Sequence, residues 1–119
     1  MITGIVVAGK RIGRTLNFPT ANLHLEAGCA APARGVYAAR VRLDGEMHMA
    51  IMNVGDHPTL PGGGPTVEVH LLDYAGDLYG RTLAVEPVRL LRGEIKFPSK
   101  EALARQLAED ARRARALLT

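Results

Sequence analysis

Short segments in which apolar and polar residues alternate, separated by turn signals, occupy most of this chain of 119 residues. The clearest of them runs from 35 to 43 and leads into Asp44-Gly45, a dipeptide that favours the tight turn of a β-hairpin. The segment 46–54 follows and is predicted to return as the second strand of that hairpin. Alternation with a period of two is typical of strands that bury one face. The first three quarters of the chain are therefore predicted to form a mainly β structure.

Three more segments extend this pattern. The run 2–8 is short and apolar, 66–72 alternates clearly, and 83–91 is a further strand that contains Pro87. Because proline cannot donate a hydrogen bond to a neighbouring strand, we expect an edge, a bend or a bulge at Pro87. Several short strands at close spacing are typical of a small barrel.

The end of the chain changes from strand to helix periodicity. Ser99 fits the N-cap position, and Glu101 in the first turn complements the helix dipole. The apolar residues then recur at helical spacing, at Leu103, Leu107, Ala111, Ala114 and Leu118. We expect a helix from about 99 to 118 that packs against the barrel.

Composition bounds the kind of protein. A chain of 119 residues that is 47% hydrophobic and 23% charged suits one globular domain over 1–119, with strands and loops in 1–98. The lone cysteine, Cys29, cannot form an internal disulfide, which favours a reducing compartment. The apolar runs are far shorter than the roughly 20 residues that span a bilayer, and the first residues lack a signal-peptide layout. We expect a cytoplasmic protein without membrane contact.

The net charge of +3 is distributed unevenly along the chain. Residues 1–40 hold five basic residues and one acidic residue, whereas 41–80 hold one basic and six acidic residues. The predicted C-terminal helix carries much of the remaining positive charge, as solvated helix faces commonly do. The basic residues near the N-terminus instead cluster among glycines, which indicates a local site for an anion.

That cluster consists of Gly9, Lys10, Arg11, Gly13 and Arg14. Glycines let backbone N–H groups approach an oxyanion, and the cations complement the charge of a phosphate. The Walker A pattern is absent, and no helix is predicted after the loop. A basic glycine turn is more often a solvated loop than a phosphate site, so the pattern alone favours the solvated loop.

Two further segments contain side chains that could take part in a reaction, one as metal ligands and one as a base. Thr20 and Asn22, two positions apart in the segment 17–23, offer neutral oxygens that suit Mg²⁺ when phosphate or water completes the ligand set. Threonine, proline and asparagine are also common in turns, and spacing alone favours a turn there. Glu68 lies on the polar face of 66–72 with His70, where it is either a general base or a solvent-facing glutamate.

These segments belong to a longer series of motifs in a fixed order. In chain order they are Gly4-x-Val6-x-x-Gly9, Gly13-Arg14-x-Leu16, Phe18-Pro19-Thr20-Ala21-Asn22-Leu23, Gly35-Val36-Tyr37, Asn53-Val54-Gly55, Pro58-Thr59, Val67-Glu68-Val69-His70, Asp77-Leu78-Tyr79-Gly80, Leu91-Arg92-x-Glu94 and Phe97. The chain resembles, over nearly its whole length, the riboflavin kinase (flavokinase) family, including the C-terminal module of bifunctional bacterial FAD synthetases.

The resemblance implies a role for each candidate residue. Thr20 would be a Mg²⁺ ligand with Asn22 beside it, and the loop from Gly9 to Arg14, with Lys10, Arg11 and Gly13, would cover the ATP phosphates. Glu68 would take the proton from the ribityl 5′-hydroxyl, and Arg92 would lie near the flavin end of the site. The implied reaction is ATP + riboflavin → ADP + FMN. The implied fold is a small closed Greek-key β-barrel of about six strands with the C-terminal helix packed against it.

The implied partners are riboflavin, FMN, ATP and ADP, with an adenylyltransferase domain or a separate enzyme acting downstream on FMN. A catalytically weak or regulatory module that binds flavin or nucleotide is the first alternative, and retention of Thr20, Asn22 and Glu68 together argues against it. A basic barrel that binds single-stranded nucleic acid is the second. Such barrels stack bases on aromatic side chains, and three tyrosines, two phenylalanines and an acidic centre fit that poorly, so we expect no nucleic-acid partner.

Overall fold

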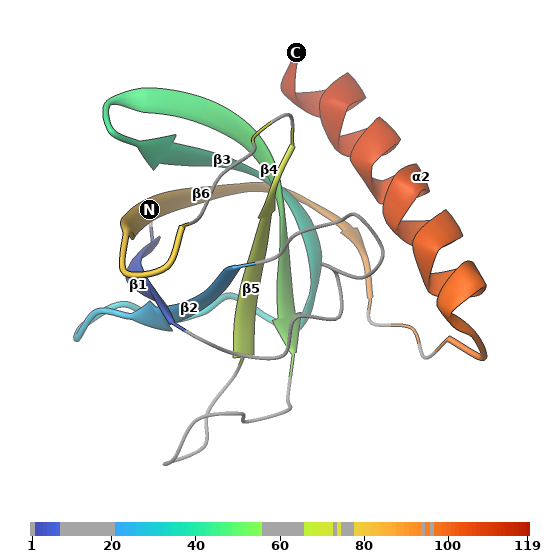
Figure 1. Cartoon of the computed structure of the whole chain (residues 1–119), viewed down its shortest axis with the longest axis horizontal. Helices are drawn as coiled ribbons and strands as arrows, with labels where there is room; N and C mark the ends of the chain where they lie inside the picture. Colours follow the sequence, from blue (N-terminus) through green and yellow to red (C-terminus); the bar gives the residue numbers. More distant parts are fainter. Residues whose placement is uncertain are drawn as a thin grey trace.

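The computed structural model shown in Figure 1 describes residues 2–7, 21–55, 66–72, 74, 78–93, 95 and 97–119. Within these residues, six strands form a closed antiparallel barrel and one helix lies against its outside. The elements are β1 (Ile2–Val7), β2 (Ala21–Leu25), β3 (Gly35–Leu43), β4 (Glu46–Gly55), β5 (Thr66–Leu71), β6 (Thr82–Arg92) and α2 (Lys100–Leu118).

The strands are ordered β1-β2-β5-β4-β3-β6 around the barrel, and β6 pairs with β1 to close it. Three consecutive strands, β3, β4 and β5, lie side by side, and β6 returns to pair with β3. A fourth strand that returns beside the first of three neighbours defines a Greek key. The predicted fold class is therefore confirmed, including the barrel, its strand number and the terminal helix.

The hairpin at the centre of the chain forms where its pattern predicts it. The strand β3 covers the predicted 35–43, and β4 extends one residue beyond the predicted 46–54. Asp44 and Gly45 between them have φ values of 52° and 82°. Positive φ at both central residues is the requirement of a type I′ turn, which matches the twist of the two strands.

The irregularity expected at Pro87 is a bulge in the interior of the sheet. Pro87 pairs with Ala39 and Arg89 pairs with Ala38, so Val88 is the extra residue on β6. The strand is not an edge, because it lies between β1 and β3. The bulge removes the conflict between a proline and a continuous hydrogen-bond ladder.

The turn that spacing favours over 17–23 is wrong for its last three residues. Ala21 and Leu23 belong to β2 and are buried in the barrel, and Asn22 lies between them on the same strand. The backbone N–H and C=O groups of β2 form hydrogen bonds with β1 on one side and β5 on the other, in place of the local hydrogen bonds that a turn would have formed. Long-range pairing overrides the turn preference of the residue types here.

Side chains fill the barrel interior and form a second cluster outside it. Val67, Val69 and Leu71 point inward, as their alternation predicts, and pack with Met52 and Leu83, whose side chains are fully buried. The outer cluster lies between the barrel and α2 and consists of Val36, Ala38, Ile51, Leu72, Leu91, Ala111, Ala114 and Leu118. The helix therefore buries part of the outer face of β3 and β4.

The helix begins and ends where its pattern predicts. The side chain of Ser99 accepts a hydrogen bond from the backbone N–H of Ala102 at 3.1 Å, which makes it the N-cap, and α2 then runs to Leu118. Ala111, Ala114 and Leu118 of the predicted stripe are buried, whereas its first two members, Leu103 and Leu107, are only partly buried. One charged residue, Asp110, is also buried on this face.

An ion pair at the protein surface joins the hairpin turn to the start of β6. Arg81 donates a hydrogen bond to the carboxylate of Asp44, and this contact holds the pKa of Asp44 below its ordinary value. The Asp44 side chain is 71% exposed and that of Arg81 is 38% exposed, so water screens the pair and limits its strength. The pair therefore contributes only modestly to stability, and its contribution depends on pH.

We expect Asp44→Asn to lower stability slightly near neutral pH and to have no effect in strong acid. Asparagine tolerates positive φ, so the turn survives while the charge is lost. Because the pKa of Asp44 is lower in the folded than in the unfolded state, the pair stabilises fully above the unfolded pKa of about 3.9, and this stabilisation is lost as the pH falls through the folded pKa. Thermal unfolding followed by circular dichroism from pH 7 downward measures this; a difference between the two proteins that grows with acidity would contradict it.

Candidate active site

Two of the predicted site residues, Asn22 and Glu68, lie directly opposite each other on β2 and β5. Opposite residues of an antiparallel pair project to the same face, with Cβ atoms about 4.5–5.5 Å apart. Val67 and Val69 on either side of Glu68 face the interior, so the glutamate and the asparagine face outward. The fold thus brings together an amide and a carboxylate that are distant in the sequence.

The surroundings of these two residues are only partly open to water. Asn22 is 8% exposed, and Glu68 is partly buried. Glu68 therefore faces outward from the barrel with part of its surface covered, and its role as a general base stays a prediction. A carboxylate beside a buried amide has a defined position and a reduced water shell, and both properties suit a group that accepts a proton from a bound hydroxyl.

Asn53 lies on the other side of Glu68. It belongs to β4, which pairs with β5 so that Asn53 is directly opposite Glu68, and its side chain is exposed. Asn22, Glu68 and Asn53 therefore form one polar row across three neighbouring strands. Asn53 is part of the sequence motif Asn53-Val54-Gly55, but no role in the site was predicted for it, although the alternation of Met52, Asn53 and Val54 would have placed it on the outer face.

Arg92 lies further along the same row. It pairs with Val36 on β3, and Val36 in turn pairs with Asn53. Three strand spacings separate Arg92 from Glu68, which corresponds to about 14 Å along the barrel surface. The two residues therefore do not act on the same atoms, and any common ligand must be extended.

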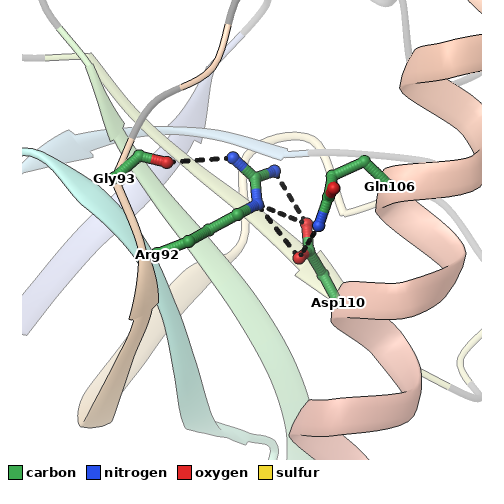
Figure 2. A network of polar contacts seen from close by, with 4 residues as sticks. All are labelled: Arg92, Gly93, Gln106 and Asp110. Carbon is green, nitrogen blue, oxygen red and sulfur yellow. Dashed lines mark hydrogen bonds and ion pairs between the residues drawn. The ribbon is translucent and has the colours of Figure 1, made fainter.

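The guanidinium of Arg92 is directed toward α2 (Figure 2). Its Nε donates to both carboxylate oxygens of Asp110, at 3.0 and 3.2 Å, and its Nη2 donates to Oδ2 at 2.8 Å. Gln106 donates from Nε2 to Oδ1 of Asp110 at 2.9 Å. Sequence reasoning also missed Asp110 and Gln106; the signal is a carboxylate within the apolar stripe, one turn from Leu107 and from Ala114.

The remaining predicted site residues lie outside the described residues. They are Gly9, Lys10, Arg11, Gly13, Arg14 and Thr20. Their assignment to the ATP phosphates and to the metal stays a prediction.

Comparison with known proteins gives a consistent result. The family model described as "Flavokinase: Riboflavin kinase" matches residues 1–118. The chain is 42% identical over 116 residues to a bifunctional riboflavin kinase/FMN adenylyltransferase of Haemophilus influenzae, covering 97% of this chain and 37% of that protein. The proteins of the same name from Escherichia coli K12 and Bacillus subtilis are 44% and 35% identical and are covered to 36% and 37% of their length.

A solved structure matches the fold closely. It is described as a macrolide-efflux protein from Streptococcus pneumoniae, and it aligns with a TM-score of 0.88 and 36% identity over 96% of this chain and 38% of that one. In the part of the chain that the structure describes, no helix is long and apolar enough to cross a membrane.

These matches cover almost all of the chain but little more than a third of each relative. The family model and the curated relatives agree with each other and with the order of motifs along the sequence. The chain therefore belongs to the riboflavin kinase family.

Proposed function

We propose that the chain transfers the γ-phosphoryl group of ATP to the 5′-hydroxyl of the ribityl chain of riboflavin, giving FMN and ADP. The observation that carries the proposal is the pairing of Asn22 with Glu68 on the outer face of the barrel, in a chain of the riboflavin kinase family. The adenylyltransferase activity in the names of the relatives is not part of the proposal. An adenylyltransferase domain or a separate enzyme would act on the FMN that this chain releases.

Glu68 is the proposed general base. The carboxylate would accept the proton of the ribityl hydroxyl as that oxygen attacks the γ-phosphorus and the bond from phosphorus to ADP breaks. The proton is then on Glu68, and the new phosphate ester does not carry it. Phosphoryl transfer needs little covalent help beyond such alignment of the hydroxyl and stabilisation of the phosphate charge. The central position of Glu68 between Asn22 and Asn53 supports this role, because amides on both sides restrict where the hydroxyl can bind.

The residues present fit a Mg²⁺ ion. Hard divalent cations prefer oxygen ligands and are commonly held by one or two protein groups together with substrate phosphates. The amide oxygen of Asn22, on a buried residue beside a carboxylate, is a suitable donor, and Thr20 is the proposed second ligand. When bound, the ion would neutralise charge on the ATP phosphates.

The remaining candidate residues are proposed to contact the phosphates of ATP and the flavin end of riboflavin. Gly9, Lys10, Arg11, Gly13 and Arg14 would bind the ATP phosphates through backbone N–H groups and side-chain cations. Arg92 would lie at the flavin end, and its separation of about 14 Å from Glu68 along the barrel suits an extended molecule whose hydroxyl is at one end. A cytoplasmic location is proposed with this function.

Incubation of the purified chain with riboflavin and MgATP is expected to produce FMN, separated by chromatography and detected by flavin fluorescence. Excess EDTA should reduce FMN formation to background, and added Mg²⁺ should restore it, because the metal is needed to neutralise the phosphates. Binding of riboflavin without any FMN would instead favour the regulatory module. Binding of an oligonucleotide at low salt, without FMN formation, would favour the nucleic-acid-binding barrel.

A further inference from the structure

The cluster formed by Arg92, Gly93, Gln106 and Asp110 joins the end of β6 to α2 (Figure 2). The Asp110 side chain is fully buried, and that of Arg92 is 13% exposed. Both carboxylate oxygens accept hydrogen bonds from the guanidinium, and Oδ1 accepts one more from Gln106. The buried charge is thus paired and hydrogen-bonded, as such charges must be.

Stability alone does not account for this arrangement. The cost of taking two charges out of water often equals or exceeds their attraction, and apolar residues of similar size can replace such pairs without loss. Ala111, Ala114 and Leu118 already provide α2 with an apolar contact to the barrel. What a bidentate carboxylate adds is direction, because two parallel hydrogen bonds fix the plane of the guanidinium.

The fixed guanidinium also holds the chain that follows β6. Its Nη1 donates to the backbone oxygen of Gly93 at 3.0 Å, and its Cζ lies 5.8 Å from the centre of the Phe97 ring. Arg92 therefore links α2 on one side with Gly93 and Phe97 on the other. Through Val36 and Asn53 it also belongs to the cross-strand row that contains Glu68.

We propose that Asp110, supported by Gln106, is a positioning residue that fixes Arg92 and the adjacent backbone for binding of riboflavin. The inference rests on the proposed function, which places Arg92 at the flavin end of the site. Asp110 does not contact the substrate and acts through Arg92. Without its carboxylate the guanidinium can occupy several orientations, and binding then carries the cost of selecting one of them.

The direct test is Asp110→Asn, which keeps the size of the side chain and removes its charge. We expect the KM for riboflavin to rise about 10-fold, as the loss of a charge-assisted hydrogen bond implies, with the KM for ATP and kcat unchanged. A merely structural role would lower the active fraction, and hence the apparent kcat, without separating the two KM values. An unchanged KM for riboflavin in folded Asp110→Asn overturns the inference.

The adjacent residue supplies a matched control. Glu109→Gln removes a negative charge from the same helix, but Glu109 pairs with Arg112 on the exposed side, where 73% of the arginine side chain is accessible. This variant should leave both KM values and kcat as they are. A rise in the riboflavin KM equal to that of Asp110→Asn would show that only the charge of α2 matters, and would overturn the inference.

Two further variants test the route through Arg92. The KM for riboflavin of the double variant Arg92→Ala with Asp110→Asn should equal that of Arg92→Ala alone, and additive effects would contradict a route through the arginine. If Asp110→Asn does not fold, Gln106→Ala decides the question, because it removes one of the two hydrogen bonds that Oδ1 accepts and leaves the bonds from Arg92 in place. It should raise the riboflavin KM in the same direction by a smaller factor, and no change would overturn the inference.

A titration of riboflavin fluorescence without ATP distinguishes this inference from the proposed function. If the unmodified chain makes FMN but binds riboflavin no better than Asp110→Asn does, the inference fails and the function stands. If the unmodified chain makes no FMN from riboflavin and MgATP, the proposed function fails, and the inference that rests on it fails as well.

Discussion

Replacing Glu68 with glutamine is expected to lower kcat for FMN formation by about 10²–10⁴-fold, the usual contribution of a general base. Glutamine has the shape of glutamate but does not accept the proton, so the hydroxyl must attack without a base. The strand β5 keeps its pairing with β2 and β4, because the main chain supplies those hydrogen bonds. Steady-state rates of FMN formation, measured with both substrates saturating, give kcat directly.

Glu86→Gln provides the control for this prediction. Glu86 is a partly buried glutamate on β6 that forms an ion pair with Arg40 at 3.5 Å. The same chemical change there should leave kcat at the value of the unmodified chain. If Glu68→Gln kept full activity while remaining folded by circular dichroism, the assignment of the base to Glu68 would be wrong.

Replacing Leu83 with alanine is expected to lower the free energy of unfolding strongly. Leu83 is fully buried inside the barrel, on β6, opposite Gly4 of β1. Truncation of a buried leucine costs about 2–5 kcal/mol, depending on how far the surroundings can collapse into the cavity. We expect a value in the upper half of that range, because strands closed into a ring by hydrogen bonds cannot move inward independently.

Leu90→Ala makes the same chemical change on the same strand at an exposed position. Leu90 is 53% exposed, so its truncation should change stability by no more than about 0.5 kcal/mol. Urea unfolding of both variants, followed by circular dichroism, measures the difference in the free energy of unfolding. An equal decrease in the free energy of unfolding for the two variants would contradict the prediction that packing inside the barrel determines stability.

The elements that could be predicted from the sequence are those whose cause is local. The hairpin follows from period-two alternation on both sides of Asp44-Gly45, and both residues have the positive φ that this turn requires. The helix follows from its apolar spacing and from Ser99, which caps it through its own side chain. In both elements, the residues that determine the conformation lie within the element or directly beside it in the sequence.

The features that could not be predicted depend on pairing between distant segments. The residue types around β2 favour a turn, and these residues form a strand because β1 and β5 lie on either side of them. The same pairing places Asn22 and Asn53 beside Glu68, and no local pattern contains that register. Asp110 could have been noticed as a charge on an apolar stripe, but its partner Arg92 depends on where α2 packs. The site was therefore predicted as separate residues, and the fold supplies their arrangement.

The pairing of β1 with β6 has a consequence for how the chain acquires its structure. Ile2 pairs with Val85, so this contact closes a loop of most of the chain, whereas β3 and β4 meet across a two-residue turn. Long-range contacts carry a large entropic cost of loop closure and are typical of slow-folding β proteins. During synthesis β1 can pair with β2 soon after both have been made, but its other edge remains without a partner until β6 has been made. Closure of the barrel at the contact between β1 and β6 is thus expected to come after formation of the local hairpin, and until it forms both strands present an unpaired edge that can pair with another chain.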